Sequence, residues 1–200
     1  MSYDFHYDSK RRFASYWHQI REVLHSSPES VLEVGVGSGF VSKYLRDHGV
    51  TLTTIDIESD LGADLVGDAR DLPFGDKSFD VVTAYEVLEH MPFGDSLIAL
   101  REMKRVARDV VIISVPDATR SACIQFPIPG IMHVRMMVTI PRLFPKKHVR
   151  TKSGHEWEIG KKGYKLSFVK SEIARQGFEI EKTYRVFENS YHRFFILKPR

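Results

Sequence analysis

The sequence predicts an α/β fold built on a doubly wound parallel sheet, and three observations lead to it. Short runs rich in β-branched residues alternate with segments of helical periodicity, which is typical of βαβ units. Residues 110–115 are apolar except for Ser114, as expected for a strand buried on both faces. The last two predicted strands are joined by too few residues for a crossover helix, so the final strand should run antiparallel.

Each element follows from the spacing of apolar side chains and from the residues that interrupt it. Ser26, Ser27 and Pro28 end the first helix, while Gly49 and Gly177 end two later ones. The predicted helices are 9–25, 38–48, 94–107 and 167–176. The predicted strands are 31–34, 50–57, 63–66, 79–84, 110–115, 178–184 and 191–197.

A chain of 200 residues is long enough for one domain with a sizeable core, so we interpret residues 1–200 as a single domain. Residues 1–27 are expected to form an N-terminal cap helix. The alternation of strands and helices breaks in residues 118–165, which hold many prolines and a dense set of basic residues. We interpret this segment as an insertion that forms a lid over the carboxyl edge of the sheet.

The composition of the chain indicates the cellular compartment in which it acts. Cys123 is the single cysteine, which excludes an intrachain disulfide and fits a reducing compartment. The first twelve residues lack the apolar core of a secretory signal. No run reaches the ~18 uninterrupted apolar residues that a membrane span requires. We therefore expect a cytoplasmic chain without membrane contact.

Charge is distributed unevenly along the chain. Residues 1–117 carry a net charge of −8, and residues 118–200 carry +11. An acidic half suits a cationic ligand and a basic half suits an anionic one. Two solvated faces of opposite sign would produce the same counts.

A glycine-rich loop follows the first predicted strand directly. Gly35, Gly37 and Gly39 allow a tight turn and let a ligand approach the backbone. In a parallel sheet, ligands bind at the carboxyl ends of the strands, which is where this loop lies. Phe40 occupies the position that the dinucleotide fingerprint G-x-G-x-x-G gives to glycine or alanine, which argues against a site for NAD or FAD.

Two aspartates follow the next two strands. Asp56 comes about 20 residues after the glycine loop, where a carboxylate accepts the ribose hydroxyls in nucleotide-binding sheets. Asp68 follows the third strand. Either residue alone could be an ordinary turn or cap. Three polar or glycine-rich strand ends in this order are more specific than any one of them.

Four segments extend this pattern. They read Val-Leu-Glu-Val-Gly-Val-Gly-Ser-Gly-Phe, Thr-Ile-Asp-Ile, Gly-Asp-Ala-Arg-Asp-Leu-Pro-Phe and Phe-Asp-Val-Val-Thr-Ala-Tyr-Glu-Val-Leu-Glu-His. Together they resemble the successive motifs of class I S-adenosylmethionine-dependent methyltransferases, in the branch with ubiquinone- and menaquinone-type enzymes. The resemblance covers about residues 30–116. It implies a Rossmann-like, doubly wound sheet of seven strands with the last strand antiparallel, and S-adenosylmethionine as the cofactor.

The resemblance also implies which strand ends contact the cofactor. Because S-adenosylmethionine is a sulfonium cation, acidic and aromatic neighbours suit it. The implied contacts are Glu33, Gly35 and Gly37 at the methionine end, Asp56 at the ribose hydroxyls, Ile57, Asp68 and Ala69 at the adenine, and Tyr85 beside the reactive methyl.

Catalytic residues are harder to identify. Methyl transfer is an in-line displacement at an activated carbon, so a general base is required only when the methyl acceptor must lose a proton. Glu86, His90 and His155 are the candidates, and each could equally be structural. One cysteine and scattered histidines lack the spacing of a zinc site, so the sequence predicts no metal ligand.

The sequence leaves three functions open. The first is methylation of a small, anionic metabolite at oxygen, nitrogen or carbon, favoured by the compact chain and its basic insertion. RNA methylation is the second, favoured by the charge of +11 in the C-terminal part. The third is a non-catalytic S-adenosylmethionine-binding module. No segment indicates an obligate protein partner.

Overall fold

The computed structural model describes residues 8–128, 131–140, 146–151 and 154–200. The helices are α1 (Lys10–His25), α2 (Phe40–Asp47), α3 (Phe93–Val106) and α4 (Leu166–Arg175), with the 3-10 turns η1 (Ser59–Leu61) and η2 (Leu88–His90). The strands are β1 (Ser30–Val34), β2 (Thr51–Asp56), β3 (Leu65–Val66), β4 (Phe79–Tyr85), β5 (Ala107–Pro116), β6 (Ser121–Ile128), β7 (Ile131–Thr139), β8 (Phe178–Arg185) and β9 (His192–Pro199).

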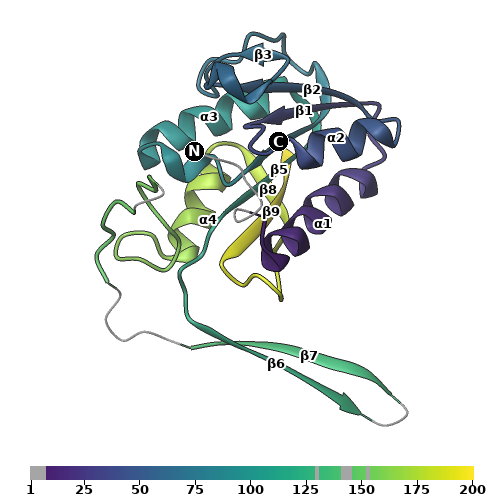
Figure 1. Cartoon of the computed structure of the whole chain (residues 1–200). Helices are drawn as coiled ribbons and strands as arrows, with labels where there is room; N and C mark the ends of the chain where they lie inside the picture. Colours follow the sequence, from purple (N-terminus) through teal and green to yellow (C-terminus); the bar gives the residue numbers. More distant parts are fainter. Residues whose placement is uncertain (1–7, 129–130, 141–145, 152–153) are drawn as a thin grey trace.

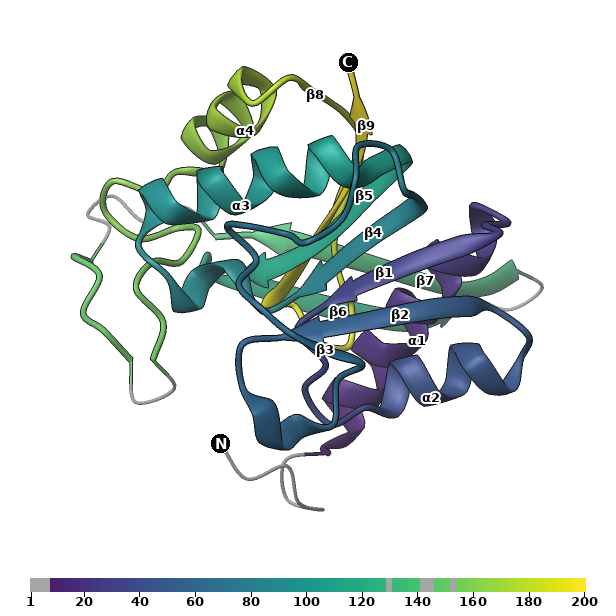
Figure 2. The same ribbon diagram turned by 90° about the horizontal axis from the view of Figure 1, so that it is seen from above.

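Seven strands form one sheet in the order β3-β2-β1-β4-β5-β9-β8. Strands β1 to β5 pair in parallel, and β9 runs antiparallel to both β5 and β8. Helices α1 and α2 cover one face of the sheet, while α3 and α4 cover the other (Figure 2). The predicted doubly wound sheet with an antiparallel last strand is therefore confirmed.

The two faces explain why the central strands are apolar throughout. Val31 of β1 and Val81 of β4 pack in the core cluster that includes residues of α1 and α2. Their neighbours Leu32 and Val82 pack in the cluster that includes residues of α3 and α4. Successive side chains of a strand point to opposite faces, so a sheet covered on both sides requires apolar residues at both.

The insertion contains a hairpin that the sequence analysis did not anticipate. Strands β6 and β7 pair antiparallel outside the main sheet, with Ile124 opposite Met136. Figure 1 shows this hairpin extending away from the body of the molecule. Its apolar face is exposed at Ile124 and Met136, while Arg135 points to Glu188 and forms a 2.8 Å ion pair. Alternation with a period of two explains why this stretch has no helical amphipathicity.

The remaining elements follow the predicted boundaries within a few residues. The N-terminal cap helix is α1, and residues 1–7 of the predicted cap lie outside the described residues. Among the described helices, none combines the length and the apolar character that a membrane crossing requires.

Asp80 ties the start of β1 to β4. Its Oδ2 accepts hydrogen bonds from the backbone N–H groups of Glu29 and Ser30, both at 2.9 Å, and from the Ser30 hydroxyl at 3.2 Å. Its Oδ1 pairs with Arg108 of β5. One buried carboxylate therefore holds three neighbouring strands at the edge opposite the glycine loop.

We expect Asp80→Ala to lower the free energy of unfolding by about 1–3 kcal/mol, because two part-buried N–H groups lose their acceptor. Asp47→Ala is the matched control, since Asp47 forms only an exposed ion pair with Lys43 and should change stability by less than about 0.5 kcal/mol. Urea unfolding measures both variants. Equal effects would show that Asp80 does not anchor β1.

Candidate active site

A cavity of about 730 Å³ opens at the carboxyl ends of β1, β2 and β4. Three segments far apart in the sequence meet there: the glycine loop, the turn after β4, and part of the insertion. All the site residues singled out from the sequence line it, namely Glu33, Gly35, Gly37, Asp56, Ile57, Asp68, Ala69, Tyr85, Glu86, His90 and His155.

Asp56 holds the glycine loop in place. Its Oδ2 accepts from the backbone N–H of Val36 at 2.8 Å, and its Oδ1 accepts from that of Glu58 at 3.0 Å. Gly35 has a φ of +83°, and a Cβ there would lie 2.3 Å from a methyl carbon of Val87. Each Asp56 oxygen has a second lone pair, so the carboxylate can still accept from two hydroxyl donors.

Helix α1 covers the glycine loop from the other side. The ring of Tyr16 stacks on that of Phe40, with centroids 5.0 Å apart, and its hydroxyl lies 3.2 Å from that of Ser38. Tyr16 and Gln19 both line the cavity. Sequence analysis missed these two residues as site residues, because helical spacing indicates only that a side chain faces inward.

The adenine end predicted from the sequence contains one exposed apolar side chain and one paired carboxylate. Ile57 is 66% exposed and lies against the cavity. Asp68 accepts from the Arg70 guanidinium, with a closest distance of 2.6 Å, and Arg70 also pairs with Asp95 at 2.7 Å. Hydrogen bonding to Arg70 lowers the pKa of Asp68. A base that donates to Asp68 would share that carboxylate with Arg70.

Glu33 is a buried carboxyl group at the end of β1. Its Oε2 has no hydrogen-bond partner among the described residues. Burial raises the pKa of Glu33 from 4.5 to about 8, and the nearby charge of Asp56 acts in the same direction. A cationic ligand group at this position would favour the ionised carboxylate.

The turn after β4 begins with a strained residue. Glu86 has a φ of +55°, a conformation that favours glycine, and its N–H donates to Ser114 of β5 at 2.9 Å. Its Oε2 lies 3.7 Å from Nε2 of His192. His192 and Tyr191 also line the cavity. Sequence analysis missed both, because their approach to the turn after β4 depends on the antiparallel pairing of β9 with β5.

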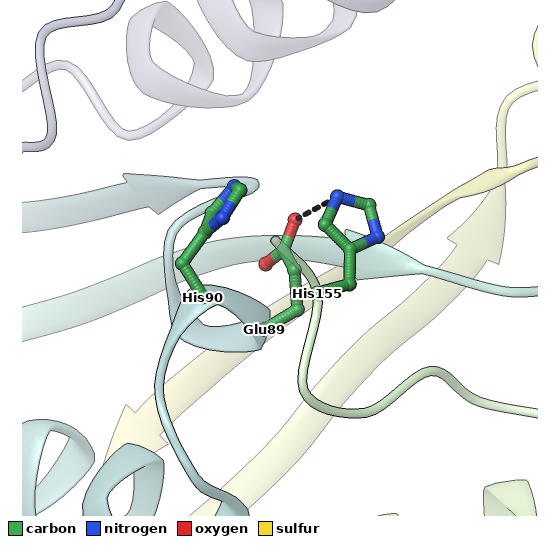
Figure 3. Close-up of side chains that lie close together, drawn as sticks. All are labelled: Glu89, His90 and His155. Carbon is green, nitrogen blue, oxygen red and sulfur yellow. Dashed lines mark ion pairs between the residues drawn. The ribbon is translucent and has the colours of Figure 1, made fainter. Parts of the chain in front are cut away.

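Glu89, His90 and His155 come together at the same end of the cavity. Figure 3 shows the carboxylate of Glu89 between the two imidazole rings. One atom from each side chain lies within 4.8 Å of the others, and Nε2 of His155 is 4.0 Å from Oε1 of Glu89. Burial and the charge of Glu86 raise the pKa of Glu89.

Two contacts bring His155 to this position. The backbone N–H of Glu156 donates to the carbonyl of Glu89 at 2.7 Å. The indole N–H of Trp157 lies 3.2 Å from the carbonyl oxygen of Leu88, and its ring is almost fully buried. The two residues that follow the histidine therefore fasten the insertion to η2. Glu89 was not singled out from the sequence, although it directly precedes His90.

Residues 32–113 match the family model described as a methyltransferase domain. This segment contains β1 to β4 and most of β5, which are the strands that build the cavity. The segment that forms these strands is therefore similar to a methyltransferase domain.

Similar proteins extend the comparison. The chain is 32% identical over 114 residues to a demethylmenaquinone methyltransferase from Thermotoga maritima, which covers 49% of each chain. It is 37% identical over 97 residues to a probable chloroplastic tocopherol O-methyltransferase from Oryza sativa subsp. japonica, covering 40% of this chain and 26% of that one. The matched segments thus span about half the length of the Thermotoga relative and about a quarter of the Oryza relative.

A solved structure shares the fold over nearly the whole chain. Magnesium protoporphyrin IX methyltransferase from Synechocystis, with bound S-adenosylhomocysteine, superposes with a TM-score of 0.64 and covers 95% of this chain and 84% of that one. The sequence identity is 16%, so this likeness concerns the fold alone. It extends the match beyond residue 113 to the strands β8 and β9.

The pH dependence of the free energy of unfolding tests whether Glu33 is buried and protonated in the folded protein. The folded protein keeps it protonated up to about pH 8, whereas the unfolded chain ionises it near 4.5. Unfolding should therefore become more favourable as pH rises through this window, by up to about 1.4 kcal/mol per pH unit. Glu33→Gln removes the ionisation, so its free energy of unfolding should fall less steeply between about pH 5 and pH 8.

Chemical denaturation at several pH values measures this difference in slope. The exposed residue Glu29 supplies the matched control, and Glu29→Gln should keep the wild-type slope. Parallel pH profiles for wild type and Glu33→Gln would contradict the buried, protonated state of Glu33.

Proposed function

We propose that this chain transfers the methyl group of S-adenosylmethionine to a small molecule. The observation that carries the proposal is that the glycine loop, Asp56, Tyr85 and His155 line one and the same cavity. In the reaction the bond between sulfur and the methyl carbon breaks, and its electron pair stays on sulfur. A lone pair of the methyl acceptor forms the new bond to carbon.

The cofactor would lie along the carboxyl ends of the strands. In this arrangement Glu33, Gly35 and Gly37 surround the methionine part and Asp56 accepts from the ribose hydroxyls. The adenine rests on Ile57 next to Asp68 and Ala69, and Tyr85 adjoins the methyl. The glycine loop lines the cavity at Gly35 and Gly37, and this lining and the spare lone pairs of Asp56 support the placement.

The methyl acceptor would enter beside the insertion. We propose that residues 118–165 form its wall through the segment around His155, which lines the cavity and is fastened to η2. Where the methyl acceptor must lose a proton, Glu86, His90 and His155 are within the same cavity to receive it. Positioning and exclusion of water supply the rest of the acceleration.

We further propose that the methyl acceptor is anionic and that the chain acts in the cytoplasm, without membrane contact or an obligate protein partner. The exposed cations Lys146, Lys147 and Arg150 of the insertion support an anionic acceptor. Arg12 and Arg70 line the cavity itself. The single, exposed Cys123 is consistent with a reducing compartment.

Cofactor binding can be measured without knowing the methyl acceptor. Calorimetry should show binding of S-adenosylhomocysteine, and Asp56→Ala should weaken it by about 1–3 kcal/mol, the scale of a lost buried polar partner. Asp60→Ala, an exposed neighbour in η1, should bind as the wild type does. Unchanged affinity in Asp56→Ala would mean that the ribose does not lie there, and binding of NAD instead would overturn the cofactor.

An assay of turnover distinguishes an enzyme from a non-catalytic binding module. We expect release of S-adenosylhomocysteine when the protein and S-adenosylmethionine are incubated with a library of small hydroxylated, amino and carbon acids. A protein that binds S-adenosylhomocysteine tightly and shows no turnover with such a library or with a metabolite extract would favour the non-catalytic module.

RNA methylation is the second candidate, favoured by the basic C-terminal part of the chain. Binding through Lys and Arg contacts to phosphates would weaken steeply with added salt. We expect no salt-sensitive binding to structured or single-stranded RNA by fluorescence anisotropy, and no methyl transfer to total RNA. Tight binding that falls tenfold or more between about 50 and 200 mM salt would instead favour an RNA substrate.

A further inference from the structure

We propose that Glu89, His90 and His155 bind a divalent transition-metal ion at the methyl-acceptor end of the cavity. Two imidazoles and one carboxylate converge there from two segments, with one atom of each side chain within 4.8 Å of the others. Metal binding at this cluster does not depend on the function proposed above, whereas the role of the ion does.

Glu89 is the strongest indication of a missing cation. Its side chain is completely buried, and neither carboxylate oxygen has a hydrogen-bond partner among the described residues. Within the described part of the chain, the one basic side-chain atom within 4.0 Å of the carboxylate is Nε2 of His155. An isolated buried carboxylate costs several kcal/mol, which a metal ion bound to its oxygens would offset.

His155 is oriented as metal-ligating histidines are. Its Nδ1 lies 3.2 Å from Oε1 of Glu158, and the same oxygen accepts from the Tyr191 hydroxyl at 2.6 Å. Because the carboxylate can only accept, Nδ1 carries the proton and Nε2 presents its lone pair toward Glu89. A carboxylate behind the histidine is the usual outer-shell arrangement at metal sites, since it holds the ring and increases its basicity.

His90 completes the set on the open side of the cluster. Its ring lies 5.0 Å from that of His155, at an angle of 85°. Gly154 of the insertion lies beside it: its φ of +86° favours glycine, and a Cβ there would be in ordinary contact with Nδ1 of His90, at 3.5 Å. Ligands at about 2.1 Å from a tetrahedral ion are about 3.4 Å apart, so small side-chain rotations would close the site.

The ligand types favour particular ions. Imidazole nitrogens prefer zinc, iron, cobalt and nickel over magnesium, which prefers oxygen. Three protein ligands leave at least one position open, as in catalytic rather than structural zinc sites. The open position would face the cavity, because all three side chains border it or adjoin it.

The role of the ion rests on the proposed methyl transfer. An alcohol or phenol of the methyl acceptor would occupy the open position, where the metal lowers the pKa of the hydroxyl. Its proton would pass to Glu86, whose Oε1 is buried and has no partner in the described part of the chain. The resulting oxygen anion would supply the lone pair that forms the bond to the methyl carbon, while the electron pair of the broken bond stays on sulfur. This narrows the class of methyl acceptor to a hydroxyl-bearing small molecule.

Metal binding is testable on the untagged chain after treatment with EDTA. Calorimetry with Zn²⁺ and the visible spectrum with Co²⁺ should show one bound ion per chain, while Mg²⁺ should bind at least tenfold more weakly than Zn²⁺. Glu89→Gln and His155→Gln should each reduce the affinity for Zn²⁺ at least tenfold. His48→Gln is the matched control, because His48 lies on the surface at the end of α2, and it should bind Zn²⁺ as the wild type does.

Thermal unfolding shows whether the variants remain folded. Glu89→Gln keeps the shape of the side chain and replaces a buried carboxyl group that lacks a hydrogen-bond partner with an amide, so the metal-free variant should melt close to the wild-type temperature. Zn²⁺ should raise the melting temperature of the wild type and leave that of Glu89→Gln unchanged. Equal Zn²⁺ affinity in wild type, Glu89→Gln and His155→Gln would overturn the metal site.

The two proposals fail separately. Zn²⁺ binding is measured without cofactor, and S-adenosylhomocysteine binding is measured in EDTA. Loss of the second with retention of the first would overturn the proposed function and leave the metal site standing. The reverse result would remove the metal site alone.

Discussion

The parallel register of β1, β2 and β4 is the constraint on which the cavity depends. Glu33 lies beside Thr54 on one side and Thr83 on the other, so the three strands end at one edge of the sheet. Each chain reversal after these strands must then occur at that edge. The glycine loop, Asp56 and the turn after Tyr85 therefore become neighbours without any local signal that links them.

The sequence predicted the position of a site residue best where that residue directly follows a predicted strand. Continuous apolar strands indicate a sheet covered on both faces, and residues that follow them must lie at its carboxyl edge. This reasoning is enough to bring the glycine loop and Asp56 to one cavity. The antiparallel last strand followed from the short connection between β8 and β9.

Contacts between segments that are distant in the sequence could not be predicted in this way. The hairpin of β6 and β7 has a period of two that is obscured by prolines and basic residues around it. Glu89 has an unremarkable place in the sequence, and only its complete burial without hydrogen bonds makes it unusual. The approach of His155 depends on Trp157 reaching η2, which no spacing rule indicates.

Each end of the cavity contains a buried carboxyl group whose negative charge, when it is ionised, requires a positive partner. Burial raises the pKa of Glu33 at the cofactor end, and Glu89 is buried without hydrogen bonds at the other. A sulfonium or ammonium group near Glu33 would displace its proton, which couples ligand binding to ionisation. A metal ion near Glu89 would neutralise that end as well, so an anionic methyl acceptor could approach a cavity lined with carboxylates. The basic insertion alone could not achieve this, because its exposed cations are screened by solvent while the carboxylates are buried.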